Sequence, residues 1–350
     1  MKKIKIGSKR IGAGEPVFII AEAGVNHNGR LDLALKLVDA AARAGVDAVK
    51  FQTFKAEQVV TNAGKMADYQ KRNTGKSESQ IEMLRSLELK DSFYGPLMKR
   101  CRERGILFLS TPHGGFDSVD FLVRLNVKAL KFGSGDLTNL PVLAHAARFK
   151  LPMILGTGMA TLTEVKEALA TIHRAGNRNV MLLHCTTNYP CPVDEVDLRA
   201  MQTMQKLPAL IGYSDHTEGI QVPIMAATLG ACVIEKHFTL DRKLPGPDHA
   251  ASLEPQELQE MVRAIRNVSV IMGSTVKRPH ASERKVMPIA RKSVVTLREV
   301  RKGQRLTRDN LGIKRPGTGS APKYYPKILH KITRKNLPSG HLLQKSDYGA

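Results

Sequence analysis

The chain has 350 residues, of which 42% are hydrophobic, and its formal net charge is +22. This length and apolar fraction indicate a globular protein with one large or two unequal domains, and they exclude a disordered chain. No apolar run approaches the ~20 residues that a membrane-spanning helix needs, so we expect no membrane partner. Four cysteines without a CxxC pair argue against a zinc ribbon or a disulfide framework.

The excess positive charge is concentrated near the C-terminus. From Lys277 to Ala350 there are 19 Lys and Arg against 4 Asp and Glu, a net +15 that leaves +7 for the first 276 residues. This region has no aromatic-rich RNA-binding motif, no Cys/His finger spacing and no obvious recognition helix. We therefore expect no nucleic-acid partner, because attraction of anionic substrates or a solvated basic face accounts for the charge.

The first residues are basic and precede an apolar run, as they would in a signal peptide. That run breaks at Glu22, however, and it lacks a small-residue cleavage site. We interpret it as a first core strand and expect a cytoplasmic protein.

Seven further apolar runs follow through the first three quarters of the chain, each ending in polar residues before an amphipathic stretch. The eight runs are 16–23, 48–52, 106–110, 129–133, 152–156, 180–185, 209–214 and 232–237. Eight strands that alternate with helices is the count of a closed (β/α)8 or TIM barrel of parallel strands. A doubly wound open sheet is the alternative, but neither a GxGxxG after the first strand nor a Walker-type GxxxxGK[ST] is present.

The helices between these runs have clear boundaries. Apolar residues predict a helix over 31–44 that stops at Gly45, and a Thr-x-x-Glu capping box begins a helix over 161–175. Between Phe54 and Asp91 the alternation lapses into a polar insertion, which is either a lid or binding loop or a plain surface excursion.

The character of the chain changes after a predicted helix over 255–272. Residues 273–287 form a polar connection, and from Arg291 onward short alternating runs appear without helical periodicity. We predict a barrel domain over 1–272, a linker over 273–287 and a small β-rich domain over 288–350. The last is poor in apolar residues, so we expect it to need a neighbouring surface.

Polar residues stand at the predicted C-terminal ends of the strands, where barrels of this kind carry their active sites. Alternation places Ser214 and His216 on one face of their strand, and Glu235 and His237 on one face of theirs. Two neutral imidazoles side by side, with carboxylates nearby, suit a divalent metal. Two unrelated histidines at loop edges are the alternative.

Two lysines lie inside apolar strands, which is costly unless an anion or a carboxylate meets them. Lys50 stands between Val49 and Phe51, and Lys131 stands between Leu130 and Phe132. With the Ser and Thr hydroxyls of neighbouring strand ends they predict a cradle for a phosphate or carboxylate group. The alternative for each lysine is a buried salt bridge to Glu22 or Glu235.

Several long motifs, in order, resemble the N-acetylneuraminate (sialic acid) synthase family. They are AEAGVNHNG (21–29), KFQTF (50–54), KFGSGD (131–136), HCTTNYP (184–190), GYSDHT (212–217) and EKHFTLDRKLPGPDH (235–249). The segment GIKRPGTG (312–319) is similar to the C-terminal antifreeze-like SAF domain of that family. The resemblance covers nearly the whole chain, and it implies a TIM barrel followed by a small β-rich SAF domain of the β-clip type.

The resemblance implies a transferase that forms a C–C bond. Phosphoenolpyruvate would condense with N-acetylmannosamine or a close analogue and water, giving N-acetylneuraminate and phosphate. The catalytic residues would be Glu22, His216 and His237, and the two histidines would hold a divalent Mn2+ or Mg2+ ion. The residues that bind phosphoenolpyruvate would be Lys50, Thr111, Lys131, Ser134 and Ser214. Those that bind the sugar would be Gln52, Asn73, Tyr189, Asp248 and Arg315.

The resemblance also implies a domain-swapped homodimer, in which Arg315 of one subunit reaches the sugar bound by the other. One position departs from the family pattern, because many members carry a hydroxyl residue where this chain has Gly156. The corresponding phosphate contact is then either missing or supplied by Thr157.

Alternatives to this function remain at the level of sequence. A legionaminic acid synthase, which uses a 2,4-diacetamido-6-deoxy hexose, has nearly the same motifs, and a pseudaminic acid synthase is a more distant option. Another phosphoenolpyruvate-dependent barrel enzyme would need cations for a sugar phosphate, and no added arginine cluster is present. From another class, a non-catalytic polyanion-binding protein would use the basic tail but would not need the strand-end residues.

Overall fold

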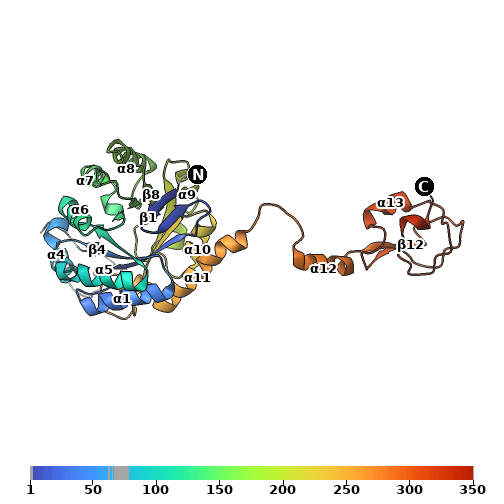
Figure 1. Cartoon of the computed structure of the whole chain (residues 1–350), viewed down its shortest axis with the longest axis horizontal. Helices are drawn as coiled ribbons and strands as arrows, with labels where there is room; N and C mark the ends of the chain where they lie inside the picture. The colour runs from blue at the N-terminus through green and yellow to red at the C-terminus, as the bar shows by residue number, and fades with distance from the viewer. Residues whose placement is uncertain (1–2, 62–63, 65, 67–78, 350) are drawn as a thin grey trace. The chain divides into compact units, whose positions relative to one another are not determined.

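The computed structural model describes residues 3–61, 64, 66 and 79–349, coloured along the chain in Figure 1. The chain divides into two compact units, Met1–Gly273 and Ser274–Ala350. The boundary falls within the polar connection expected over 273–287, and this stretch includes the start of a helix, α12 (Ala281–Ala290).

Eight parallel strands form the centre of the first unit, as predicted. They are β3 (Phe18–Gly24), β4 (Ala48–Thr53), β5 (Leu107–Pro112), β6 (Leu130–Phe132), β7 (Met153–Gly156), β8 (Val180–His184), β9 (Leu210–Asp215) and β10 (Val233–His237). Their hydrogen-bonded order is β5-β4-β3-β10-β9-β8-β7-β6, so the first and last strands of the eight pair with each other. The two ends of this series, β5 and β6, lie side by side, which makes a nearly closed TIM-like barrel.

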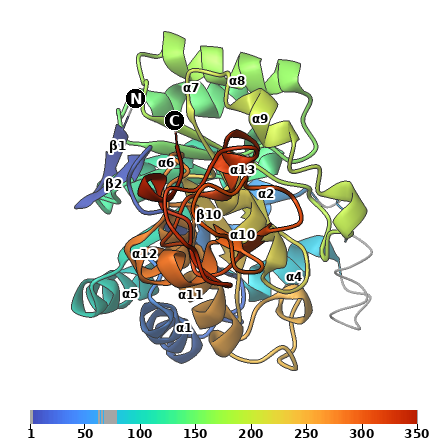
Figure 2. The ribbon, with the colours of Figure 1, turned by 90° about the vertical axis from the view of Figure 1, so that its right-hand side faces the viewer.

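Helices cover the outside of the strands (Figure 2). They are α1 (Leu31–Ala44), α2 (Ala56–Val59), α4 (Gln80–Ser86), α5 (Asp91–Arg104), α6 (Gly115–Arg124), α7 (Leu140–Ala147), α8 (Leu162–Arg174), α9 (Ala200–Met204), α10 (Gln221–Thr228) and α11 (Pro255–Met272). Helix α1 ends where predicted, because Gly45 adopts a left-handed conformation with φ 83°. Helix α8 begins with the predicted capping box, in which Thr161 and Glu164 exchange side-chain and backbone hydrogen bonds.

The N-terminal segment forms a hairpin that the sequence interpretation missed. Strands β1 (Lys3–Ile6) and β2 (Lys9–Gly12) pair antiparallel, and they precede the first barrel strand. Ile4, Ile6 and Ile11 of the hairpin are buried with Phe18 and the other residues that fill the barrel interior. Each fully buried isoleucine contributes about 1.5–3 kcal/mol, so the hairpin is a stable plug at the amino end of the barrel.

The second unit is a small β-rich domain, as predicted. Strands β11 (Ser293–Thr296) and β12 (Leu311–Lys314) pair antiparallel, and isolated bridges join further segments. The short helices are α13 (Tyr325–Ile328), η4 (Pro322–Tyr324) and η5 (Lys345–Asp347). The core consists of Val294, Val300, Leu306, Leu311, Ile328, Leu337 and Leu343.

Among the helices of the described ranges, none is long and apolar enough to cross a membrane.

Candidate active site

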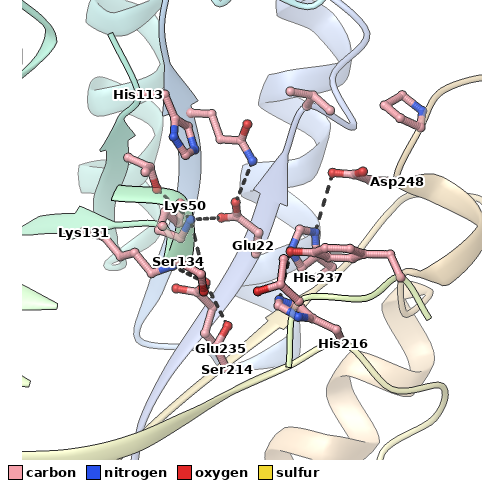
Figure 3. Close-up of a pocket in the computed structure, with 18 of the residues that line it drawn as sticks. Glu22, Lys50, His113, Lys131, Ser134, Ser214, His216, Glu235, His237 and Asp248 are labelled. Carbon is pink, nitrogen blue, oxygen red and sulfur yellow. Dashed lines mark hydrogen bonds and ion pairs between the residues drawn. The ribbon is translucent and has the colours of Figure 1, made fainter. Parts of the chain in front are cut away.

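A cavity of about 250 Å³ opens at the C-terminal ends of the barrel strands. The predicted site residues that line it come from the ends of seven strands and the loops that follow them (Figure 3). They are Glu22, Lys50, Gln52, Thr111, Lys131, Ser134, Tyr189, Ser214, His216, His237 and Asp248. Asn73 lies outside the described residues. Arg315 belongs to the other unit, where it follows β12 and is exposed.

Strand register explains why these side chains meet. Parallel pairing aligns Glu22 with Lys50 on one side of β3 and with His237 on the other. Glu235 is aligned with Ser214 in the same way. Residues at the same level of neighbouring parallel strands point to the same face, so these side chains of β3, β4, β9 and β10 converge.

Buried ion pairs connect the lysines to the carboxylates. Lys50 Nζ lies 2.7 Å from Glu22 Oε2 and 3.8 Å from Glu235 Oε1, and Lys131 Nζ lies 3.0 Å from Glu235 Oε1. The four side chains are between 2% and 7% exposed. Lys50 also donates to Thr111 Oγ1 at 2.9 Å. The salt bridges considered from the sequence are thus present, and they are compatible with an anion site because the hydroxyls and ammonium groups still face the cavity.

The pKa values of the two buried carboxyl groups, Glu22 and Glu235, are shifted in opposite directions. Burial raises the pKa of Glu22, and the nearby charge of Lys50 only partly offsets this effect. Burial also acts on Glu235, but Lys131 and Lys50 outweigh it and lower the pKa of that carboxyl. Glu22 is therefore the carboxyl that holds a proton more readily. Paired carboxyl groups whose pKa values are pushed apart are the usual arrangement for acid and base roles.

The histidines form a pair on the opposite side of the cavity. The ring centroids of His216 and His237 are 5.5 Å apart. His216 Nδ1 lies 2.6 Å from the Thr186 carbonyl oxygen, to which it donates a hydrogen bond. In a neutral ring the other nitrogen, Nε2, is then an acceptor, and it lies 3.1 Å from the Tyr189 hydroxyl. Burial lowers the pKa of His216 to about 4 and that of His237 well below its usual range. Both rings are therefore neutral at pH 7.

Neutral imidazoles with nitrogens directed to a shared space are suited to a divalent metal. His237 Nδ1 is buried without a hydrogen-bond partner among the described residues, and Asp248 Oδ2 lies 3.8 Å from it. In the described part of the chain, no group of three or more His, Cys, Asp and Glu side chains is placed to hold a metal ion. The residues thus fit an ion with two protein nitrogens whose other ligands are oxygens of water or substrate.

One wall of the cavity is apolar. It consists of Val25, Met83, Leu84 and Leu87, which belong to one small cluster. Three of them come from α4 and the residue after it, so this part of the insertion between Phe54 and Asp91 contributes to the binding site. Burial raises the pKa of Asp248, which also lines the cavity, to about 6.

The position of Gly156 is sterically restricted. A Cβ atom there would lie 3.0 Å from Ser134 Oγ, so a larger residue would displace this hydroxyl. Thr157 is no replacement, because its hydroxyl donates to the Leu183 carbonyl oxygen at 2.9 Å. Ser134 Oγ instead accepts from the Gly158 amide at 3.0 Å, and Ser134 is the hydroxyl residue at this corner of the cavity.

Two groups were not identified from the sequence. His113 lines the cavity immediately after β5, and only its place after a predicted strand end could have drawn attention to it. Asp215 and Lys236 form an ion pair of 2.5 Å, at most 1% exposed, between the residues that face the cavity. Strand alternation already placed Asp215 and Lys236 on the opposite face from His216 and His237, so the sequence pattern could have indicated that these two residues pair with each other.

Comparison with known proteins identifies the family. The model of the NeuB family matches residues 37–277, and that of the SAF domain matches residues 291–348. The chain is 46% identical over 346 residues, 96% of each chain, to the N,N'-diacetyllegionaminic acid synthase of Legionella pneumophila. It is 38% identical over 332 residues to the human N-acetylneuraminate-9-phosphate synthase, covering 93% of this chain and 90% of that one.

A solved structure agrees with this assignment. The N-acetylneuraminic acid synthetase of Leptospira borgpetersenii, solved in complex with citrate, superposes with a TM-score of 0.71 at 35% identity. The match covers 81% of this chain and 94% of that one. The strand-end constellation, the barrel and the small C-terminal domain thus occur together, and the chain belongs to the NeuB family of phosphoenolpyruvate-dependent nonulosonic acid synthases, with a C-terminal SAF domain.

Proposed function

We propose that this enzyme is an N,N'-diacetyllegionaminic acid synthase, which condenses phosphoenolpyruvate with a 2,4-diacetamido-6-deoxy hexose. The observation that carries the proposal is the higher identity, over nearly the whole chain, to a legionaminic acid synthase than to the synthases of N-acetylneuraminate type. This alternative is therefore better supported than N-acetylmannosamine, the substrate first expected from the motifs.

The apolar wall of the cavity supports the same choice of sugar. A 6-deoxy sugar carries a methyl group where N-acetylmannosamine has a hydroxymethyl group. Val25, Met83 and Leu87 are at most 6% exposed and offer no hydrogen-bonding side-chain group. Packing a methyl group on such a wall is favourable by about 0.8 kcal/mol, whereas an unpaired hydroxyl there has a cost.

The residues of the cavity suit a defined order of bond changes. Lys50, Lys131, Thr111, Ser134 and Ser214 would hold the carboxylate and phosphate groups of phosphoenolpyruvate. A bond forms between its C3 atom and the aldehyde carbon of the open-chain sugar, whose oxygen takes up a proton. Water then adds to C2, and the bond between C2 and the phosphate oxygen breaks, which releases phosphate and leaves the ketone.

Glu22 is the proposed proton-transfer group. Burial raises its pKa, so it holds a proton more readily than an ordinary carboxyl group and could exchange it with the attacking water or the sugar. Gln52 Nε2 donates to Glu22 Oε1 at 3.3 Å, which orients the carboxyl group. Gln52, Tyr189 and Asp248 would hold the hydroxyl and acetamido groups of the sugar, and Asn73 is proposed for the same role.

His216 and His237 would hold the divalent ion, Mn2+ or Mg2+. When bound, such an ion supplies Lewis-acid polarisation of a carbonyl oxygen. The protein keeps both imidazoles neutral by burial and fixes His216 through the Thr186 carbonyl oxygen. These are the properties that a metal ligand needs before the ion arrives.

Arg315 is proposed to reach the sugar from the partner subunit of a domain-swapped homodimer. The loop that carries it is fixed within its own unit, because Gly317 N donates to the Pro288 carbonyl oxygen and Ser293 Oγ to that of Pro316, both at 2.7 Å. Its side chain is exposed there, so it is available to a second surface.

A panel of sugars tests the proposed substrate. The protein is incubated with phosphoenolpyruvate, MnCl2 and one sugar at a time, and phosphate release is measured. The sugars are N-acetylmannosamine, its 6-phosphate and the diacetamido-trideoxy hexoses that lead to legionaminic and pseudaminic acids. We expect kcat/KM for the legionaminic precursor to exceed the others by about tenfold or more, as one lost methyl or unpaired hydroxyl contact implies. A preference for N-acetylmannosamine would contradict the proposal.

A further inference from the structure

His113 occupies a fixed position at the edge of the cavity. It follows β5 directly, and its backbone N–H points to the carbonyl oxygens of Thr53 and Thr111, at 3.0 and 3.1 Å. The residue is thus anchored to the ends of both β4 and β5. In Figure 3 its ring lies on the side of the cavity away from His216 and His237.

A carboxylate and a glycine hold the imidazole ring. Asp136 Oδ2, in η1 (Ser134–Asp136) after β6, lies 3.2 Å from His113 Nδ1. This oxygen is buried and has no hydrogen-bond partner among the described residues, so His113 is the group that meets its charge. A Cβ atom on Gly133 would lie 3.0 Å from Cε1 of the ring. Gly133 has φ −69°, so its missing side chain serves the close approach of the ring rather than an unusual backbone.

The contact joins the two strands that end the hydrogen-bonded series of the barrel. Thr111 stands on β5, Lys131 on β6 and Ser134 directly after β6, so the cradle proposed for phosphoenolpyruvate lies across the same junction. His113 therefore lies at the same junction as Thr111, Lys131 and Ser134, and it lines the same cavity.

The chemistry of the ring is suited to an anion. Nδ1 faces Asp136, and the side chain is 28% exposed, which leaves Nε2 without a hydrogen bond in the described part of the structure. A protonated imidazole is a donor at both nitrogens, so a ring whose Nδ1 faces a carboxylate can direct Nε2 to an anion as a charge-assisted donor. The lysines of the cradle are already paired with Glu22 and Glu235, so a third cationic donor would add to the attraction for an anion.

We propose that His113, held by Asp136 and Gly133, is a further residue that contacts the phosphate group of phosphoenolpyruvate. The proposal rests on the proposed function only in taking phosphoenolpyruvate as the ligand, and it is independent of the identity of the sugar. Its test is therefore a binding measurement without sugar.

The test uses three variants and a matched control. His113→Gln removes the imidazole donor, Asp136→Asn removes its charged partner, and Gly133→Ala keeps both groups but displaces the ring. The control is His145→Gln, because His145 also pairs with a carboxylate, Asp120 at 2.6 Å, and is 26% exposed, but lies outside the cavity. Dissociation constants for phosphoenolpyruvate, inorganic phosphate and pyruvate are measured by calorimetry on the full-length protein with MnCl2, and folding is checked by thermal unfolding.

We expect His113→Gln to weaken phosphoenolpyruvate and inorganic phosphate binding about tenfold, the loss of one hydrogen bond to a charged group, with pyruvate binding unchanged. Asp136→Asn and Gly133→Ala should weaken the same two ligands about threefold, and His145→Gln should weaken neither. Unchanged phosphate affinity in the three variants would overturn the proposal, as would a change confined to pyruvate or to the KM of the sugar. If His113→Gln fails to fold, the other two variants decide. A native protein that binds phosphoenolpyruvate but turns over no sugar of the panel would contradict the proposed function and leave this comparison intact.

Discussion

Around the barrel cavity the charged groups are buried and matched in sign, whereas those of the C-terminal unit are mostly exposed and of one sign. Lys50 and Lys131 are 2% and 7% exposed and face the carboxylates of Glu22 and Glu235. In the C-terminal unit, Lys335 is 55% exposed although its partner Asp347 is fully buried. Most of its other lysines and arginines are exposed, and acidic residues are few.

This difference separates two uses of charge. Buried pairs are hardly screened by salt and hold each other in one geometry, which a reacting site requires. Exposed charges contribute little to stability individually, but together they attract anions over a longer range. We therefore propose that the barrel charges serve positioning and chemistry, and that the basic unit helps to collect anionic substrate.

The largest effect is expected from breaking a matched pair in the barrel. Lys131→Met leaves Glu235 buried with only the more distant Lys50, so the free energy of unfolding should fall by about 3–5 kcal/mol and phosphate release should be nearly abolished. Lys335→Met is the matched change in the C-terminal unit and should cost about 1 kcal/mol or less, since one partner is exposed. Urea denaturation and a phosphate-release assay measure both. Equal losses of stability in Lys131→Met and Lys335→Met would contradict the proposed difference between buried and exposed charge pairs.

Removing either imidazole tests the metal role. His216→Ala and His237→Ala should each lower phosphate release about a hundredfold or more and weaken Mn2+ binding, because several kcal/mol of Lewis-acid stabilisation are lost. Mn2+ titration followed by electron paramagnetic resonance provides the binding constant. His184→Gln is the control, since His184 also ends a strand but donates to the Val196 carbonyl oxygen outside the cavity. Full activity of both variants after chelation would show that the histidines have another role.

Arg315→Ala tests whether the exposed unit completes the buried site. We expect turnover to fall about ten- to a hundredfold without a change in unfolding, as for the loss of one charged contact to substrate. Arg308→Ala, also exposed, should have no such effect. Coexpression with Lys131→Met sharpens the test, because mixed dimers would contain one intact site. Activity should then recover to roughly a quarter of native. Normal kinetics of Arg315→Ala, or no recovery, would contradict the trans arrangement.

The smallest effect concerns a buried imidazole near the cavity. Burial lowers the pKa of His27 to about 4, with a further contribution from His249. Below pH 6.5 the unfolded chain takes up a proton that the folded chain excludes, so stability is full above this pH and is lost as pH falls toward 4. The loss between pH 6.5 and pH 5 should be about 2 kcal/mol from His27.

Urea denaturation across this pH range measures the effect. His27→Asn should flatten the slope by about this amount, whereas His330→Asn in the C-terminal unit should leave it unchanged. His330 is exposed and has φ 70°, a conformation that asparagine tolerates, so this control adds no strain. An unchanged slope in His27→Asn would rule out the buried imidazole as the source.

The barrel was predictable because its local signals agree with its tertiary structure. Apolar runs of strand length ended in polar residues, and Gly45 and Thr161 marked helix ends that the structure confirms. The hairpin of β1 and β2 was missed because its strands have only four residues each and merge with the next apolar run. Short strands gain their stability from the barrel interior, which local sequence does not reveal.

The site was predictable in its members more than in its contacts. Alternation placed the lysines, acids and histidines on the cavity face, and within the described part of the barrel unit the structure brings the predicted site residues together around one cavity. Sequence could not tell which carboxylate pairs with which lysine, because that depends on the register between distant strands. His113 and Asp136 were missed for the same reason, since their contact joins two strand ends separated by a helix.

Ile4, Ile6 and Ile11 close the amino end of the barrel, so small molecules have no path to the site from that end. Reactants and products must then pass the same rim of loops at the carboxyl end. Phosphate leaving after one turnover would meet the phosphoenolpyruvate arriving for the next, and with the proposed cradle both would be attracted to the same lysines. Accumulated phosphate should therefore inhibit the enzyme by competing with phosphoenolpyruvate. The steady-state rate would then depend on how fast phosphate is removed as well as on the rate of the chemical step.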